Sequence, residues 1–188
     1  YWKIETKNTY TSKGWEQLVS DENPTVYSPG MDMEEFKPVV GVEGGNIELA
    51  QLTMTERFPF IIYPYGMTKV FTDAEVIFHN EKETGKYKTE IVDDEGTLDS
   101  YEVEFVEHEY SLKALRDTTM DSLQSSGEDF RNYLQLPEEL PSRVGELAHS
   151  ITASSDNVYD KTKAIERYFG KNGFVYDQKD IAIPEDED

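Results

Sequence analysis

The residues of this chain that could take part in chemistry are three histidines and many carboxylates, because the sequence contains no cysteine. No two of His79, His108 and His149 stand four residues apart, and together they form no zinc signature. Without a thiol, these residues can form no disulfide, no thiolate metal site and no cysteine nucleophile. The sequence also lacks a G-x-S-x-G elbow, a P-loop and a G-x-G-x-x-G loop. We therefore predict no catalytic, cofactor-binding or metal-binding residue within the chain.

Acidic residues dominate the charge, with 39 Asp and Glu against 18 Lys and Arg and a net charge of -21. This balance disfavours nucleic acid and anionic lipid as partners, because binding to both depends on Lys and Arg that neutralise phosphate. The acidic turn at 93–96 and the acidic tail at 185–188 offer the carboxylate oxygens that calcium prefers. The spacing at 93–96 departs from that of an EF-hand. We interpret the acidity as a solvated surface and expect no cofactor.

Apolar residues that alternate with a period of two predict strands through most of residues 2–110. Every second residue is apolar in the segments 74–78 and 101–105, and in the segment 47–55 Ala50, Leu52 and Met54 lie on one face. The apolar run 58–63 predicts a short buried strand. The apolar parity changes near Phe105, so we expect a bulge or a strand break there.

Turn residues separate these segments. The sequence predicts turns or loops at 11–14, 20–30, 44–46, 80–86 and 93–96. Trp2, Ile4 and Thr6 predict a half-buried first strand, and we expect Trp15 to return into the core. Short strands at this close spacing are typical of an antiparallel β-sandwich or barrel.

After residue 120 the apolar period changes from two to 3.6. Residues 118–127 are rich in serine and are interpreted as a linker. One apolar helical face is then formed by residues at i, i+3, i+4 and i+7, namely Val144, Leu147, Ala148 and Ile151. Pro141 suits the first turn of this helix, because its missing N–H is not needed there.

A polar break at 152–156 ends this helix, and Asn157 is expected to cap the next one. The second helix presents an apolar stripe formed by Val158, Ile165 and Phe169. Glycines at 170 and 173 supply stop signals. The run 174–176 then predicts a short strand. The fold class predicted is thus α+β, with an antiparallel sandwich or barrel followed by a small helical segment.

Two separated parts of the chain carry a family resemblance. The first comprises Tyr133-Leu134-Gln135-Leu136-Pro137 and the segments 143–152, 159–168 and 173–176. It resembles the leading part of a bacterial transglutaminase-like domain. The second comprises Tyr1-Trp2-Lys3 and the segment 9–15, and is similar to the start of the extracytoplasmic region that precedes this domain in a family of multi-pass membrane proteins. Between residues 16 and 110 the likeness is limited to a β-rich pattern.

The resemblance implies a papain-like enzyme with a Cys-His-Asp triad whose Cys and His would follow Asp188. It therefore assigns no triad residue to this chain. It implies a β-rich accessory domain at 1–120 and an incomplete helical part of the catalytic domain at 121–188. The chain would be a non-catalytic segment of a cysteine protease or acyltransferase, at the extracytoplasmic face of the bacterial membrane. Its partners would be the catalytic domain and the membrane helices of its own polypeptide.

A different reading is a β-sandwich module that binds a protein or a cell-surface polymer, with some of the 12 Tyr and 2 Trp as contacts. The competing interpretation of these aromatic residues is that they fill a β core. A cysteine after a glycine, at a helix start in the sequence that follows Asp188, would favour the enzyme reading over the binding module.

The two helical stripes must be covered by something, because fully burying a Leu, Ile or Phe side chain stabilises a protein by roughly 1.5–3 kcal/mol. Two helices packed on each other cannot cover all of both faces. We read the chain as a segment cut from a longer protein. We therefore expect either a homodimer through residues 140–176 or an exposed apolar patch there.

Overall fold

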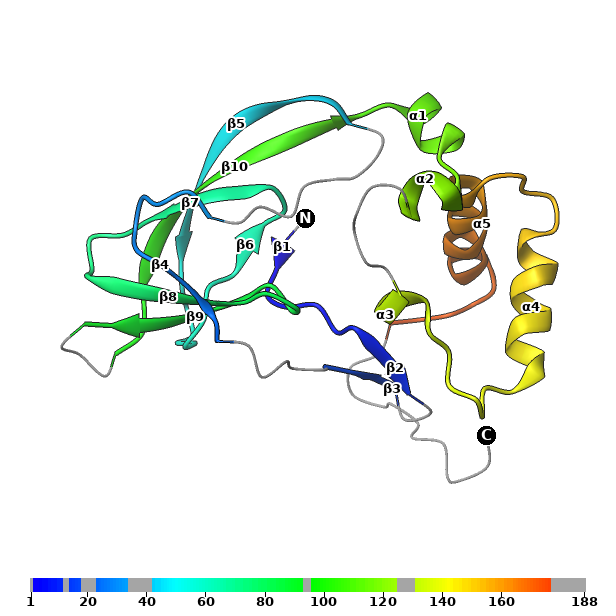
Figure 1. Cartoon of the computed structure of the whole chain (residues 1–188), viewed down its shortest axis with the longest axis horizontal. Helices are drawn as coiled ribbons and strands as arrows, with labels where there is room; N and C mark the ends of the chain where they lie inside the picture. Colours follow the sequence, from blue (N-terminus) through cyan, green and yellow to red (C-terminus); the bar gives the residue numbers. More distant parts are fainter. Residues whose placement is uncertain are drawn as a thin grey trace.

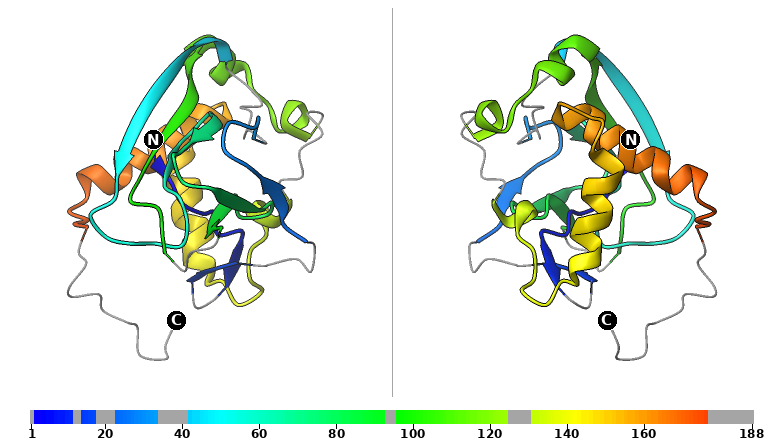
Figure 2. Two further views of the ribbon diagram at one scale, coloured as in Figure 1. Left: turned by 90° about the vertical axis from the view of Figure 1, so that its left-hand side faces the viewer. Right: turned by 90° about the vertical axis from the view of Figure 1, so that its right-hand side faces the viewer.

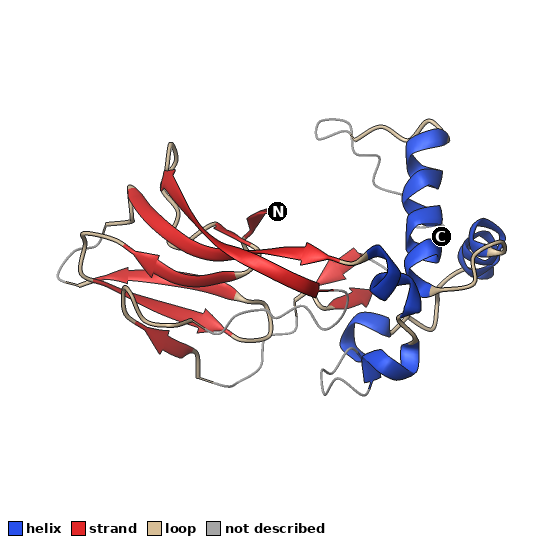
Figure 3. Cartoon of the chain, turned by 90° about the horizontal axis from the view of Figure 1, so that it is seen from above, coloured by secondary structure: helices blue, strands red, loops and turns tan. Residues whose placement is uncertain are grey.

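The structure is a computed structural model of the chain, and it describes residues 2–11, 14–17, 23–33, 42–92, 96–124 and 131–176. All of its strands precede residue 111 and all of its helices follow it, so the fold is α+β, as predicted. Figure 3 shows the strands gathered on one side and the helices on the other. No helix of the described ranges is long and apolar enough to cross a membrane.

The first sheet contains three antiparallel strands in the order β5-β10-β7. Strand β5 (Val42–Thr53) and strand β10 (Ser100–Tyr110) pair along almost their whole length and form a long ribbon. Strand β7 (Met67–Phe71) covers only the central part of β10. The register of β10 against β7 shifts between Glu104 and Phe105, which confirms the irregularity predicted from the change of apolar parity. Figure 1 shows the ribbon leading from the sheet to the helices.

The second sheet has the order β4-β8-β9 and is also antiparallel. It contains β4 (Thr25–Tyr27), β8 (Val76–Glu81) and β9 (Lys86–Ile91). The turn between β8 and β9 lies where the glycine and charged residues predict it. Strand β4 lies inside the segment 20–30 that we expected to be a loop, and this prediction is wrong because Tyr27 enters the core beside Phe78.

Two smaller pairs complete the β-rich region. Strand β1 (Trp2–Lys3) pairs with β6 (Tyr63–Pro64), and β2 (Thr9–Thr11) forms a hairpin with β3 (Gly14–Glu16). The strands of these two pairs are two or three residues long, so both pairs depend on neighbouring elements for their stability.

The core lies between the two three-stranded sheets, which pack face to face as in a sandwich. Residues at alternate positions of both sheets contribute to it, as the period of two predicts. Its best-buried members are Ile61, Val70, Val76, Phe78, Tyr87 and Val103.

Two aromatic or apolar segments near the N-terminus depart from the prediction. Trp15 does not return to the core; it is 48% exposed and contacts the Tyr10 ring at a tilted angle across the β2–β3 hairpin, with ring centroids 5.2 Å apart. Trp2 and Ile4 are exposed, whereas Lys3 between them is half-buried. The parity is inverted because the aliphatic stem of a lysine can be buried while its amine reaches polar groups.

Two further predictions in the β-rich region are wrong. Residues 44–46 form no turn but lie inside β5. Gly45 is there because a Cβ would meet the Val106 side chain at 2.6 Å. The run 58–63 forms a single bridge between Phe60 and Lys88, and only Tyr63 belongs to a strand. Pro59 lacks the N–H that a longer ladder would need.

Five helices follow the ribbon: α1 (Leu112–Asp117), α2 (Met120–Gln124), α3 (Arg131–Leu134), α4 (Ser142–Thr152) and α5 (Val158–Lys171). Helix α2 lies in the predicted linker, part of which is outside the described residues. Helices α4 and α5 occupy the two predicted stripes, and α5 is capped by Asn157, whose side chain accepts from the Asp160 N–H at 2.8 Å. Figure 2 shows α4 and α5 packed against each other.

The ends of the helices differ from the prediction in three details. Pro141 is the residue before α4 and not in its first turn. Helix α5 continues through Gly170, and the left-handed Gly173, with a φ of 76°, follows its end. The run 174–176 is not a strand in the structure, because no other segment lies beside it as a pairing partner among the described residues.

Candidate functional site

The three histidines lie apart, each with its own partners. The Nε2 atom of His79 lies 2.8 Å from a carboxylate oxygen of Glu90 on β9. His108 lies between the rings of Tyr65 and Tyr110 on the outer part of the ribbon. The Nδ1 atom of His149, in the last turn of α4, lies 2.8 Å from the Gly145 carbonyl oxygen. Among the described residues, no group of three His, Asp or Glu side chains could hold a metal ion.

The acidic segments add little to this picture. Residues 93–95 of the acidic turn and the tail at 185–188 lie outside the described residues. An open cavity of about 560 Å³ at one end of the β5–β10 ribbon is lined by Asp73, Asp99 and Glu102 together with Phe71 and Tyr101. Asp99 already forms an ion pair with Arg57 at 3.4 Å. The remaining carboxylates at this cavity disfavour anionic ligands.

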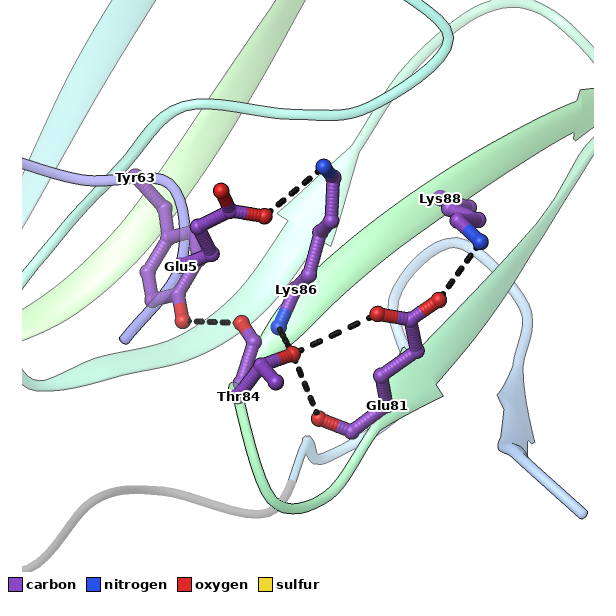
Figure 4. Close-up of polar contacts among 7 residues, drawn as sticks. Glu5, Tyr63, Glu81, Thr84, Lys86 and Lys88 are labelled. Atoms are coloured by element: carbon purple, nitrogen blue, oxygen red, sulfur yellow. Dashed lines mark hydrogen bonds and ion pairs between the residues drawn. The ribbon is translucent and has the colours of Figure 1, made fainter. Parts of the chain in front are cut away.

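A polar cluster joins the N-terminal segment to the β8–β9 turn, and Figure 4 shows its contacts. Lys86 Nζ donates to a Glu5 carboxylate at 2.8 Å, and the Tyr63 hydroxyl donates to the Gly85 carbonyl at 2.5 Å. Thr84 is almost fully buried, and its carbonyl accepts from the Thr6 N–H at 2.8 Å. These bonds hold residues that are far apart in sequence, so the cluster has a structural role.

The electrostatics of this cluster agree with a structural role. Burial raises the pKa of the Tyr63 phenol well above its ordinary value, so the hydroxyl remains a donor. Burial lowers the pKa of the Lys3 amine from its ordinary value.

The most unusual surface lies on the helices. No residue of α4 or α5 is buried, although both helices carry the predicted apolar stripes. Val144 and Leu147 on α4 are exposed, as are Ile165 and Phe169 on α5. Ile151 and Val158 are half-buried where the two helices meet. We call the exposed surface formed by these four side chains, together with residues 174–176, the helical face.

Aromatic rings extend the helical face beyond the end of α5. The rings of Phe169 and Phe174 lie 5.0 Å apart at centroids, and Tyr168 lies 5.8 Å from each. Phe174, Val175 and Tyr176 are among the most exposed apolar residues that the structure describes. Monomeric proteins rarely expose a contiguous apolar surface of this kind without a function for it.

Two polar contacts connect the helices with one another and with the β-rich region. Within the helical segment, the guanidinium of Arg116 on α1 lies 3.2 Å from the Asp160 carboxylate on α5. The Gln135 side chain after α3 donates to the Tyr10 carbonyl at 2.9 Å. Both contacts are polar and neither lies on the apolar stripes. The β-rich region therefore leaves the helical face uncovered.

Comparison with known proteins supplies one relative. The chain is 26% identical over 193 aligned positions to the uncharacterized protein YebA of Bacillus subtilis, and the match covers 100% of this chain. The chain spans about a quarter of that relative's length, since the aligned part is 26% of it. No protein-family model matches the chain, and no solved structure matches it significantly.

These observations make the helical face the candidate docking surface of the chain. The sequence predicted the stripes of α4 and α5, and their side chains are exposed in the single chain. A dimer through this face and an exposed patch both stay predictions. The exposed run 174–176 was not predicted, because it was interpreted as a strand.

Proposed function

We propose that this chain is the non-catalytic part of a transglutaminase-like cysteine protease or acyltransferase, where it positions or shields the catalytic domain. The observation that carries the proposal is the helical face, on which Val144, Leu147, Ile165 and Phe169 remain exposed. A helical pair with one uncovered face fits a segment that packs against another domain of the same polypeptide. Residues 133–176 resemble the leading helices of a transglutaminase-like domain, and this resemblance is our reason for proposing that domain as the partner.

The share of YebA that aligns with this chain supports the proposal. Since the chain covers a quarter of YebA, the relative has a large further part that could hold such a catalytic domain. Catalysis of this type needs a thiolate activated by a neighbouring histidine and donors for the oxyanion. This chain has no thiol, so we propose that it acts in docking and that the catalytic residues lie in the rest of the parent polypeptide. The extracytoplasmic placement at the bacterial membrane belongs to the same proposal.

The test uses the parent polypeptide. We expect its amide hydrolysis or transamidation to depend on a cysteine beyond residue 188, and to fall when Leu147 and Phe169 are both replaced by Asp. Val26→Asp, which changes an exposed apolar residue on β4, is the matched control and should leave the activity unchanged. A parent without such a cysteine, or with full activity after the double replacement, would overturn the proposal.

A further inference from the structure

Strand β5 is a free sheet edge in the part of the chain that the structure describes. In the order β5-β10-β7 it is terminal, and its only strand partner is β10. It extends over 12 residues, about twice the usual length of a strand. Figure 1 shows it on the outside of the ribbon.

From Gly44 to Thr53 the edge lacks most of the features by which proteins prevent unwanted strand pairing: its register shift lies at the start, between Val42 and Gly44, and Glu48 is its one charged residue. Such edges are usually short, or carry Lys, Pro or a bulge. Residues 42–53 contain no Lys, Arg or Pro, and the register with β10 stays regular from Gly44 to Thr53. Ile47 is 69% exposed and Leu49 is 60% exposed. An edge of this kind is suited to accept a further strand.

The direction of the backbone groups follows from two hydrogen bonds. The Met54 N–H donates to the Asp99 carbonyl, so Met54 points its N–H toward the strand that continues into β10. N–H directions alternate along an antiparallel strand, so those of Ile47, Leu49 and Gln51 point away from β10. The Val106 N–H agrees with this, because it pairs with Ile47 and donates to Gly66 on the opposite side.

The two faces of the ribbon differ in chemistry next to this edge. Residues that pair directly share a face, so Ile47 lies beside Val106 on one face. Leu49 follows along β5 and pairs with Glu104, whose carboxylate already lies 3.4 Å from the Lys69 amine and accepts from the Thr68 hydroxyl. The other face carries Glu48, Glu107 and Glu109, the last two paired with Asn46 and Gly44. No ion pair to these three carboxylates is formed by the described residues.

We infer that β5 binds an extended protein segment by strand addition, and that this segment alternates apolar residues with Lys or Arg. Its apolar side chains lie on the face of Ile47 and Leu49, and its basic side chains lie on the face of Glu48. The outward N–H and C=O groups of Ile47, Leu49 and Gln51 supply the hydrogen bonds. The inference is independent of the proposed function, because it concerns a different surface from the helical face.

Charge also argues against a second copy of this chain as the occupant. Antiparallel pairing of two β5 strands would add no basic side chain to the edge and would place the Glu48 carboxylates of both copies near it. Each copy also carries a net charge of -21. Like charges across paired strands are destabilising.

The test is amide hydrogen exchange, measured by NMR on the whole chain with and without a synthetic peptide of alternating valine and lysine. At a free peptide concentration ten times Kd, the amides of Ile47, Leu49 and Gln51 should exchange about tenfold more slowly. The amides of Asn46 and Glu48, which already point toward β10, should change less. A peptide with glutamate in place of lysine, and a lysine peptide with a central proline, are the matched controls and should give no protection.

Variants separate the edge from the rest of the surface. Ile47→Lys with Leu49→Lys should abolish the protection, whereas Val26→Lys on the edge strand β4 should preserve it. Unchanged thermal unfolding shows that the double variant still folds. Three results would overturn the inference: no protection of the outward amides, equal protection by the glutamate peptide, or protection without peptide that grows with protein concentration, which would show pairing between copies.

Discussion

The β-rich region and the helical segment have similar apolar patterns but bury them very differently. Phe78 on β8 is fully buried between two sheets, whereas Phe169 on α5 is 51% exposed. The β-rich region supplies both layers of its own core. The helical segment supplies one layer, and α4 and α5 have no buried residue. An apolar stripe therefore predicts which face of a helix needs a partner, but the partner does not have to lie in the same chain.

The largest effect that distinguishes the two regions is that of removing a phenyl ring. Phe78→Ala should lower the free energy of unfolding by about 3–5 kcal/mol, because it leaves a cavity in a packed core. Phe169→Ala should lower it by about 1 kcal/mol, because only its contacts with Tyr168 and Phe174 are lost. Urea unfolding of both variants measures the difference. Equal losses would show that the helical face is packed in solution.

The next effect concerns independent folding of the β-rich region. A chain that ends at residue 115 keeps both sheets and all residues of the core cluster, so it should unfold cooperatively in urea. The domain boundary near residue 120 rests on this prediction. A truncated chain that behaves as disordered would show that the helices belong to the same folding unit.

The sequence was sufficient to predict those elements whose apolar residues recur with the same period as the buried positions in the structure. Strands β8, β9 and β10, helices α4 and α5, and the Asn157 cap all lie where apolar spacing and capping residues predict them. These signals are local, since each depends on residues within a few positions. Two helices can cover only a limited area of each other, so the sequence predicted either a dimer or an exposed apolar patch at the stripes.

The sequence was insufficient where a contact with a distant segment decides the structure. The pair at 44–45 predicts a turn, but it lies inside β5, where a Cβ on Gly45 would meet the Val106 side chain. Trp15 reads as a core residue, but it packs on Tyr10 in a two-strand hairpin that no sheet covers. The free edge of β5 could not be predicted either, because strand order is not encoded in the local pattern.

A smaller effect is expected at the junction between α1 and α5. The Asn157 side chain lowers the pKa of the Asp160 carboxyl, and Arg116 and Arg167 act in the same direction. The folded state therefore favours the ionised carboxylate. Its contribution to stability is present above the ordinary pKa of an aspartate, about 3.9, and is lost as the pH falls through the lower folded value.

Asp160→Asn tests this sign. It should reduce stability slightly at neutral pH, and its effect should become smaller as the pH falls through the lowered pKa of the folded state, where the aspartate of the unmodified chain is itself protonated. Asp156→Asn removes the same charge one residue before the cap and is the matched control. Thermal unfolding followed by circular dichroism at several pH values measures both. A loss that grows toward acidic pH would contradict the assignment.

The smallest effect is expected from thiol reagents. Because the chain contains no cysteine, iodoacetamide at neutral pH should leave its mass unchanged, and the purified chain should show no thiol-dependent transamidation or amide hydrolysis. Mass spectrometry and a release assay for ammonia check these outcomes. Turnover by the purified chain that is sensitive to a thiol reagent would contradict the proposal that the catalytic residues lie in the rest of the parent polypeptide.

The most direct test of the account is the binding of a dye that fluoresces on exposed apolar surface, measured together with light scattering. We predict either a monomer with a strong dye signal or a dimer. Leu147→Asp with Phe169→Asp should remove most of the signal in the first case and dissociate the dimer in the second. Val26→Asp serves as the control for exposed apolar area. A monomer with a negligible dye signal would show that the helical face is covered within this chain, and the account would be wrong.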